Sequence, residues 1–182
     1  SSNVDNSTIT NHGTISASAN LGYGILYEND GTNRVNNTLN NYGTISATSG
    51  SFADGIGIGR TANPMFNITI NNYGTITGSG NSIYILNSSS TGINIVTKDE
   101  GTYEGSIDLK DSTTTMTLDC SISKDQKIEI LNKTNMVVTN NLCGNDTSEI
   151  LDNNSDPDAD NSETDGFLYV YGEDLDIDSH NK

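Results

Sequence analysis

The chain has 182 residues, of which 32% are hydrophobic and none is tryptophan. Its 24 acidic residues outnumber the 8 lysines and arginines, which gives a formal net charge of −16. A field of this sign repels nucleic acid and anionic membrane surfaces, so the composition argues against both as partners. No apolar run in the sequence is long enough for a membrane-spanning helix.

One short motif recurs in the first part of the chain. Residues 9–15, 39–45 and 70–76 each carry an aliphatic residue, an asparagine two residues later and a closing Gly-Thr-Ile. The glycines of the three copies are 30 and then 31 residues apart, and the same step predicts a fourth, worn copy at Gly105. A fixed period of this size indicates a stacked repeat.

Side chains alternate in character within each copy, which is the period of a strand rather than of a helix. The third copy places Ile70, Asn72 and Ile76 on one face, with Tyr73 and Thr75 on the other. Stacking the copies predicts an inward ladder of amides that hydrogen-bond from coil to coil, and an outward ladder of rings. The inward ladder consists of Asn11, Asn41 and Asn72, and the outward one of His12, Tyr42 and Tyr73.

Two further sets of short apolar segments repeat between these copies. One set comprises residues 24–27, 55–58 and 82–85, and the other comprises residues 34–35, 65–66 and 93–95. Each period therefore holds about three short strands joined by Gly, Asn and Ser. The sequence predicts an all-β fold, a right-handed parallel β-helix (β-solenoid) with coils of about 30 residues. A β-sandwich would not explain heptads repeated at a constant spacing.

We expect three parts along the chain. Residues 1–109 hold the repetitive coils, residues 110–151 keep strand patterning without the motif, and residues 152–182 combine an acidic loop with a C-terminal strand. The middle part contains Cys120 and Cys143, whose spacing does not suggest a zinc site. A disulfide is expected if the protein is exported, and two free buried thiols are the alternative.

The acidic loop is the most suggestive cluster for metal binding. Its alternating carboxylates resemble the DxDxD calcium loops of the EF-hand and thrombospondin type 3 families. Asn161 stands where an EF-hand loop has glycine and Phe167 where it has its bidentate glutamate, so an EF-hand is rejected and a looser Ca²⁺ loop remains. A solvated loop without metal is the alternative. The candidate ligands are Asp156, Asp158, Asp160, Glu163 and Asp165.

The last apolar run is expected to be a strand, and it consists of Phe167, Leu168, Tyr169, Val170 and Tyr171. A β-helix exposes unpaired backbone groups at both ends. Irregular caps, membership of a longer passenger, or head-to-tail stacking into a filament would each answer this problem. In the filament, this final strand would pair with the edge of a neighbouring subunit.

The sequence carries little that suggests catalysis. Asp54, Asp99 and Glu100 could line one side of the solenoid, but no basic residue pairs with them in the pattern, and no Ser-His-Asp arrangement is evident. We therefore expect no enzymatic activity. Outward tyrosines could form a strip that contacts carbohydrate or protein, or could only stiffen the coils. They are Tyr42 and Tyr73, with Tyr27 and Tyr84 from the second set of strands.

The repeated Asn-Tyr-Gly-Thr-Ile, with its intervening Gly-Ile strands, resembles the passenger regions of bacterial autotransporter and haemagglutinin-like adhesins over residues 8–109. The resemblance implies a right-handed β-helix, export to the bacterial cell surface, and adhesion or extracellular structure. It brings no catalytic residues.

Scarce lysine and a polar start at Ser1 also favour export. We expect an extracellular structural or adhesive protein whose partners are its own copies or surface glycans and proteins, with Ca²⁺ as the one candidate cofactor. A secreted β-helix that binds or cleaves polysaccharide, in the manner of a tailspike or lyase, is the alternative.

Overall fold

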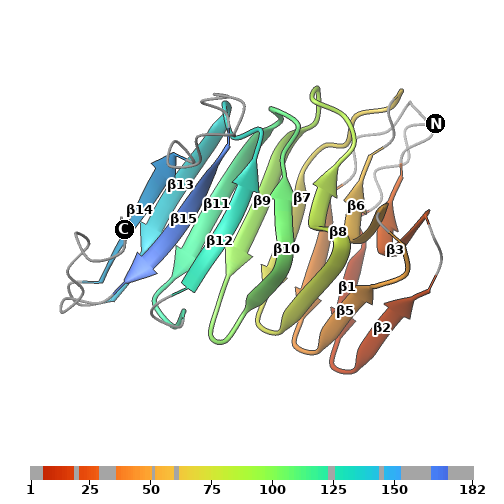
Figure 1. Cartoon of the computed structure of the whole chain (residues 1–182), viewed down its shortest axis with the longest axis horizontal. Helices are drawn as coiled ribbons and strands as arrows, with labels where there is room; N and C mark the ends of the chain where they lie inside the picture. The colour runs from red at the N-terminus through yellow and green to blue at the C-terminus, as the bar shows by residue number, and fades with distance from the viewer. Residues whose placement is uncertain are drawn as a thin grey trace.

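The computed structural model describes residues 6–18, 21–28, 36–50, 52–59, 62–122, 126–143, 146–152 and 165–171. It contains 0% helix, and its parallel sheets stack as a β-solenoid, so the predicted fold class is confirmed. The strands lie side by side along the long axis, from the N-terminal coil at one end to β13 and β14 at the other (Figure 1). Nowhere in these residues is there a helix long and apolar enough to cross a membrane.

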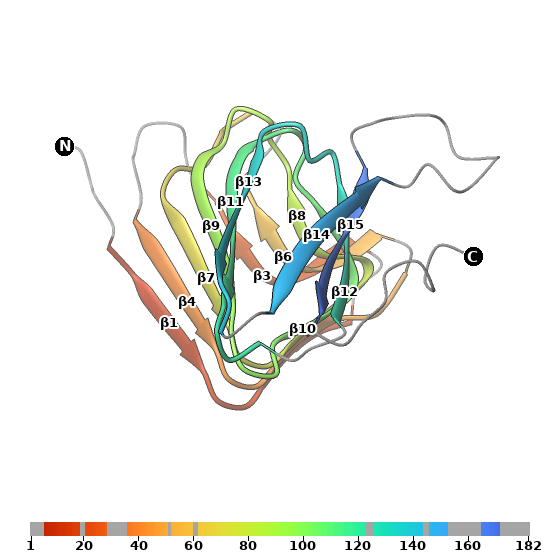
Figure 2. The same ribbon diagram turned by 90° about the vertical axis from the view of Figure 1, so that its left-hand side faces the viewer.

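Sheet A is a 6-stranded wall in which every neighbouring pair is parallel. Figure 2 looks along the solenoid and shows this wall on one side, with strands of the second sheet on the other. Its strands, in spatial order, are β1 (Thr8–Asn11), β4 (Asn37–Asn41), β7 (Ile68–Asn72), β9 (Thr91–Thr97), β11 (Thr113–Asp119) and β13 (Met136–Asn141).

Sheet B has 9 strands and two kinds of coil. Each of the first two coils contributes two separate short strands to this sheet, β2 and β3 and then β5 and β6. In the third coil a single strand, β8, replaces the two, and it pairs first with β5 and then with β6. Its strands are β2 (Thr14–Ala17), β3 (Leu21–Tyr27), β5 (Thr44–Ala47), β6 (Phe52–Ile58), β8 (Thr75–Ile85), β10 (Thr102–Asp108), β12 (Gln126–Leu131), β14 (Thr147–Asp152) and β15 (Gly166–Tyr171).

The core consists of aliphatic columns that run along the solenoid, one residue from each coil. In sheet A, Leu39 and Ile70 are fully buried and in register, and in sheet B the same holds for Ile56 and Ile83. Each such isoleucine or leucine contributes roughly 1.5–3 kcal/mol through removal of its side chain from water. The predicted inward and outward faces of the motif are therefore confirmed.

The predicted amide ladder is present inside the bends that join the two sheets. Asn11 Nδ2 donates to Asn41 Oδ1 at 2.9 Å, and Asn41 Nδ2 donates to Asn72 Oδ1 at 2.9 Å. The three side chains are buried, and each amide also donates to a backbone carbonyl of the following coil. The ladder thus satisfies polar groups that the core would otherwise leave unpaired.

The coil length is not constant. The Asn ladder steps by 30 and 31 residues, but Thr102 stacks on Thr75 after 27 and Leu131 on Asp108 after 23. The fourth copy of the motif therefore lies at Gly101, whose neighbour Thr102 donates its N–H to the Gly74 carbonyl, and the prediction of Gly105 was wrong. The fusion of two short strands into β8 removes the loop between them, and this shortens the coil.

The two intervening sets of strands had different outcomes. Ile83 and Ile85 align with Ile56 and Ile58, as predicted. The grouping of residues 93–95 with 65–66 was wrong, because residue Ile95 pairs in register with Ile70 of the motif strand β7. The shortened coil again accounts for the error.

At the C-terminal end of sheet B, β15 is inserted between two other strands and β14 forms the outer edge. Strand β15 lies between β12 and β14 and is antiparallel to both, so each of its edges already has a partner. Its predicted pairing with a neighbouring subunit was therefore wrong. Sheet A continues through β11 and β13 without a break at the boundary expected after residue 109.

Candidate functional site

A ladder of side chains runs along the outside of the bends and changes chemistry from coil to coil. The His12 and Tyr42 rings are stacked with centroids 4.8 Å apart, and Tyr42 and Tyr73 with centroids 4.3 Å apart. In the next coil Lys98 Nζ lies 5.5 Å from the centroid of the Tyr73 ring and 3.7 Å from Asp119 Oδ2. We call this row the outer ladder.

The geometry of the outer ladder favours the structural interpretation over recognition. Both faces of the Tyr42 ring are covered by neighbouring rings, although the side chain is 46% exposed. A ligand could reach only ring edges, whereas sugars stack on ring faces. Tyr27, which we expected on the surface, is 6% exposed and lies in the core, and its hydroxyl has no hydrogen-bond partner among the described residues.

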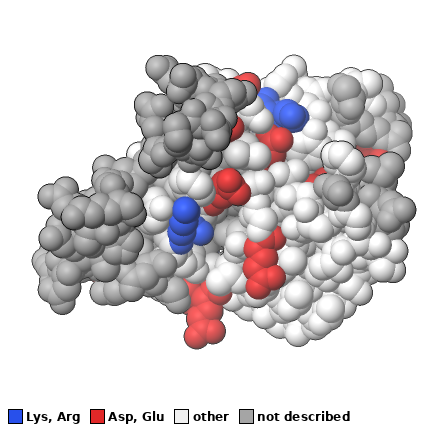
Figure 3. All heavy atoms as spheres, in the orientation of Figure 1, with Lys and Arg blue, Asp and Glu red and all other residues white. Residues whose placement is uncertain are grey.

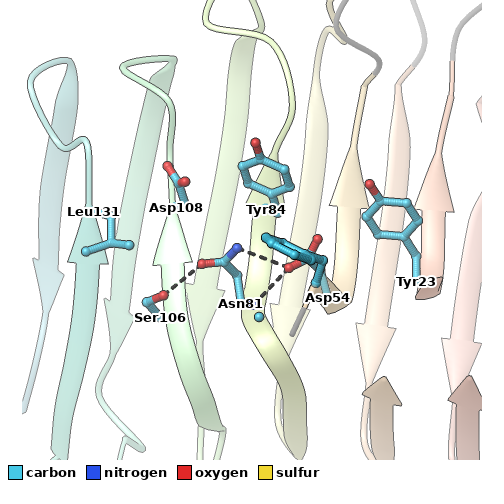
Figure 4. A pocket seen from close by; sticks show the side chains of 9 residues that line it. Tyr23, Asp54, Asn81, Tyr84, Ser106, Asp108 and Leu131 are labelled. Atoms are coloured by element: carbon cyan, nitrogen blue, oxygen red, sulfur yellow. Dashed lines mark hydrogen bonds between the residues drawn. The ribbon is translucent and has the colours of Figure 1, made fainter. Parts of the chain in front are cut away.

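A groove crosses the outer surface of sheet B, and we treat it as the candidate site. It has a volume of about 560 Å³, within the range typical of ligand pockets. Its walls come from β3, β6, β8, β10 and β12, and so from five successive turns of the chain (Figure 4). The lining residues are Tyr23, Phe52, Asp54, Gly80, Asn81, Tyr84, Ser106, Asp108 and Leu131.

The first side of the groove is a polar row with one residue from each coil. Tyr23 is in register with Asp54, and Asn81 is in register with Ser106. Asp54 Oδ1 accepts hydrogen bonds from the Asn81 backbone N–H at 2.8 Å and from Asn81 Nδ2 at 3.0 Å, and Ser106 Oγ donates to Asn81 Oδ1 at 2.8 Å (Figure 4). The row is therefore rigid across three coils.

A local irregularity accompanies the outward turn of Asn81 in this row. Asn81 and Ile83 are two residues apart and would share a face in a regular strand. The register between β8 and β10 shifts at this point, however, so that Ser82 is an extra residue. Such bulges re-aim side chains, and here Asn81 faces the groove while Ile83 stays in the core.

On the second side of the groove, Gly57 has no side chain and lies between the larger residues Leu26 and Tyr84. The register runs from Leu26 through Gly57 and Tyr84 to Asp108. A Cβ at Gly57 would collide with the ring of Tyr23, which shows that this ring lies over the glycine. The absence of a side chain at Gly57 thus lets Tyr23 lie across the groove.

Two buried carboxylates stand in the groove. Asp54 is 4% exposed, and its burial raises its pKa above the ordinary value against the lowering effect of the two Asn81 hydrogen bonds, with the charge of Asp108 raising it further. Burial likewise raises the pKa of the Tyr23 hydroxyl, and the charge of Asp54 adds to this effect.

Asp108 is held at the other end of the groove by its neighbours. It is 7% exposed, accepts a hydrogen bond from Asn132 Nδ2 at 2.7 Å, and lies 3.5 Å from Lys110 Nζ. The same ammonium lies 5.4 Å from the centroid of the Tyr84 ring. Burial lowers the pKa of Lys110, but the charges and hydrogen bonds of Asp108 and Tyr84 outweigh it and raise the pKa overall.

The groove can therefore present ring faces and hydrogen-bond acceptors to one ligand. Phe52 is 71% exposed, and the Tyr23 and Tyr84 rings are half-buried. The carboxylates of Asp54 and Asp108 accept hydrogen bonds but disfavour an anionic ligand. On the face of sheet B seen in Figure 3, much of the described surface is uncharged, with acidic side chains scattered over it.

The structure describes little of the predicted calcium site. Four of its five candidate ligands, Asp156, Asp158, Asp160 and Glu163, lie outside the described residues, so the site stays a prediction. Asp165 accepts a hydrogen bond from the Asn132 N–H at 2.7 Å, and its carbonyl accepts one from Lys133 Nζ at 3.1 Å. Within the described ranges there is no cluster of three or more His, Cys, Asp or Glu suited to a metal.

Cys120 and Cys143 form a disulfide, with their Cα atoms 4.7 Å apart. The bond joins the end of β11 to the segment after β13, and so links adjacent coils of sheet A. Both residues are exposed, which excludes the alternative of buried free thiols.

No family model, curated protein or solved structure matches this chain. The groove is therefore interpreted from its own residues. Of these, sequence analysis singled out Asp54 and Tyr84 but did not bring them together. Aligning the second set of strands would have placed Tyr23, Asp54 and Asn81 at equivalent positions, because each stands two residues before an isoleucine of the same column.

Proposed function

We propose that this protein is an extracellular adhesive β-solenoid that binds a neutral glycan in the groove of sheet B. The observation that carries the proposal is the combination of Tyr23, Phe52 and Tyr84 with the carboxylates of Asp54 and Asp108 in one groove. Aromatic rings offer flat apolar surface to the C–H faces of a sugar. Carboxylates accept hydrogen bonds from its hydroxyls.

The electrostatics of the groove support a neutral ligand over an acidic one. Asp54 and Asp108 are buried, and the one described cation against them is Lys110, which lies 3.5 Å from Asp108. A uronate or sulfate would meet two carboxylates at a site already poor in water. The net charge of −16 adds a repulsive field at longer range.

Two other features support a location outside the cell. The Cys120–Cys143 disulfide suits an oxidising compartment, where such bonds persist. The stacked ladders of amides and rings give a stiff scaffold without a large core, which suits a surface structural element. The final strand β15 is already paired on both edges, with β12 and β14, so it is not available for the head-to-tail contact, and this argues against that form of the filament.

The test is binding of neutral and acidic oligosaccharides to the purified chain, first on a glycan array and then by calorimetry. Tyr84→Ala and Phe52→Ala each remove a ring from the groove, and each is expected to weaken binding of a neutral glycan at least tenfold, or about 1.4 kcal/mol. Val137→Ala is the control, because Val137 is 59% exposed on β13 and lies outside the groove. Binding that survives both groove variants, or a preference for polyuronates, would contradict the proposal.

A second candidate is cleavage of the glycan in the same groove, and it is favoured by the two carboxylates. The raised pKa of Asp54 suits a proton donor, while Asp108, hydrogen-bonded to Asn132, suits a base. Incubation with each bound oligosaccharide, followed by mass spectrometry of the products, separates the two functions. Products that disappear in both Asp54→Asn and Asp108→Asn would show cleavage, whereas intact glycan leaves adhesion alone.

A further inference from the structure

Glycine is required in the later copies of the motif because the coils stack so closely. A Cβ placed at Gly43 would overlap the carbonyl oxygen of Gly13, and a Cβ placed at Gly74 would overlap that of Gly43. Both obstacles are backbone atoms of the preceding coil, held by hydrogen bonds such as that from the Thr44 N–H to the Gly13 carbonyl at 2.8 Å. The glycine of each copy is thus a consequence of the coil before it.

Gly13 has no such reason within the described chain. A Cβ placed there meets nothing within 4 Å. Its backbone does not need glycine either, because the described glycines with positive φ are Gly50, Gly59, Gly92 and Gly105. The first copy therefore carries a feature that only stacking on a preceding coil explains.

The core and both ladders are also open at this end. Ile9 is 37% exposed, whereas Leu39 of the next coil is fully buried. Asn41 Oδ1 accepts the amide of the preceding coil, whereas Asn11 Oδ1 accepts, among the described residues, only the Gly13 N–H at 3.1 Å. Of the rings that the structure describes, His12 is stacked on Tyr42 alone.

We propose that the N-terminal face of the solenoid, formed by β1, β2 and the bend at Gly13, is a docking surface for a further parallel coil that carries the same Asn-aromatic-Gly-Thr-Ile motif. The backbone of that coil places a carbonyl against Gly13, its asparagine donates to Asn11 Oδ1, and its ring stacks on His12. Its aliphatic residue covers Ile9. This surface continues the coil-to-coil interface already present between β1 and β4.

A second copy of the chain does not offer such a coil. At its C-terminal end the antiparallel strand β15 separates β14 from β12, so the last strand of sheet B is not stacked on the coil before it as the other coils are. The bend after β13 contains Leu142 and the disulfide-bonded Cys143 where the motif has its glycine and threonine. Two N-terminal faces related by a two-fold axis would pair antiparallel, and the bends would then not nest. The occupant is therefore a solenoid coil that is not part of a second copy of this chain and that stacks on β1 and β2.

The experiment supplies that coil. The second coil comprises residues 36–66, because Asn36 is equivalent to Asn6 and the next coil begins at Asn67. These residues are inserted between Asp5 and Asn6 of the full chain. We expect the insertion to raise the denaturation midpoint and to slow amide hydrogen exchange in β1. The informative variant is Gly13→Ala in both chains. It should leave the midpoint of the original chain unchanged and lower that of the extended chain, and Gly43→Ala should lower the midpoint of the original chain in the same way.

Two results would overturn the proposal. One is an extended chain in which Gly13→Ala has no effect and β1 exchanges as fast as before, which would mean that the inserted coil does not stack. The other is a concentration-dependent dimer of the original chain, seen by sedimentation and abolished by Gly13→Val, which would make a second copy the occupant. Glycan binding enters neither readout, so the outcome is independent of the proposed function.

Discussion

Asn41 Nδ2 donates a hydrogen bond to Asn72 Oδ1 at 2.9 Å, although the two residues are 31 positions apart in the chain. Both side chains are fully buried. Because each amide donates to the next coil and accepts from the previous one, the middle residue carries hydrogen bonds on both sides. Removing it therefore breaks hydrogen bonds to two neighbouring coils.

We expect Asn41→Ala to lower the free energy of unfolding by about 3 kcal/mol, because it leaves the buried Asn72 Oδ1 without its donor and removes the hydrogen bonds of Asn41 with Asn11 and the Thr75 carbonyl. The matched control is Asn40→Ala, one residue earlier on the half-buried outward face, where Oδ1 accepts a single bond from Asn71 at 2.9 Å. The control should cost under about 1 kcal/mol. Urea titration measures both, and equal losses would show that the inner ladder has no special weight.

Substitutions at two glycines of β6 can distinguish effects on folding from effects on the groove. A Cβ at Gly57 meets the movable ring of Tyr23, whereas a Cβ at Gly55 meets the backbone carbonyls of Ser82 and Thr77. Gly57→Ala should therefore fold with a near-normal midpoint but displace the ring and weaken glycan binding, while Gly55→Ala should destabilise the coil. Thermal melts and calorimetry check this. The assignment fails if Gly57→Ala binds as wild type.

The disulfide closes a loop with a sequence separation of 23 residues. Loop-closure entropy for a loop of this size predicts that reduction lowers the free energy of unfolding by about 3 kcal/mol. The double variant Cys120→Ser, Cys143→Ser should match the reduced protein and should not respond to reductant. If reduction leaves the denaturation midpoint unchanged, the cross-link does not constrain the unfolded chain.

Burial of Asp54 predicts a pH dependence of definite sign. Its pKa is raised above 3.8 in the folded state, so folding favours the protonated carboxyl. The stabilisation that protonated Asp54 gives to the folded state is present below pH 3.8 and is lost as pH rises through the folded-state pKa. Asp54→Asn keeps an Oδ1 acceptor for Asn81, so it should melt higher than wild type at about pH 7 and lose this advantage near pH 3. Melting curves across this range provide the check, and a constant difference would contradict it.

The fold was predictable because its evidence is local and repeated. Asn41, Tyr42 and Gly43 stand at the same positions as Asn72, Tyr73 and Gly74, and stacking copies in register requires only a constant step. The step failed at Gly101 because the fourth copy was placed with a constant step, although the second set of segments already advances by only 27 residues from 55 to 82. The insertion of β15 between β12 and β14 was missed because a five-residue apolar run has no signal for which neighbour it joins, or in which direction.

The groove was less predictable because its residues depart from the regular alternation of side chains along a strand. Strict alternation places Tyr23 with Ile25 and Asp54 with Ile56, in the core. Tyr23 and Asp54 line the groove instead, as does Asn81, where the register between β8 and β10 shifts. Sequence periodicity does not announce this departure from alternation. Sequence patterns thus identified the regular coils, while the candidate site lies where the strands depart from regularity.

The disulfide also changes how the chain would respond to a pulling force, which bears on the proposed adhesive role. A fully extended chain reaches about 3.4 Å per residue, so the 23-residue loop represents roughly 80 Å of contour length. In the oxidised protein this length is not released when β11 and β13 are torn apart. Single-molecule extension should therefore be shorter by that amount before reduction than after it, and the tether would stay short under load.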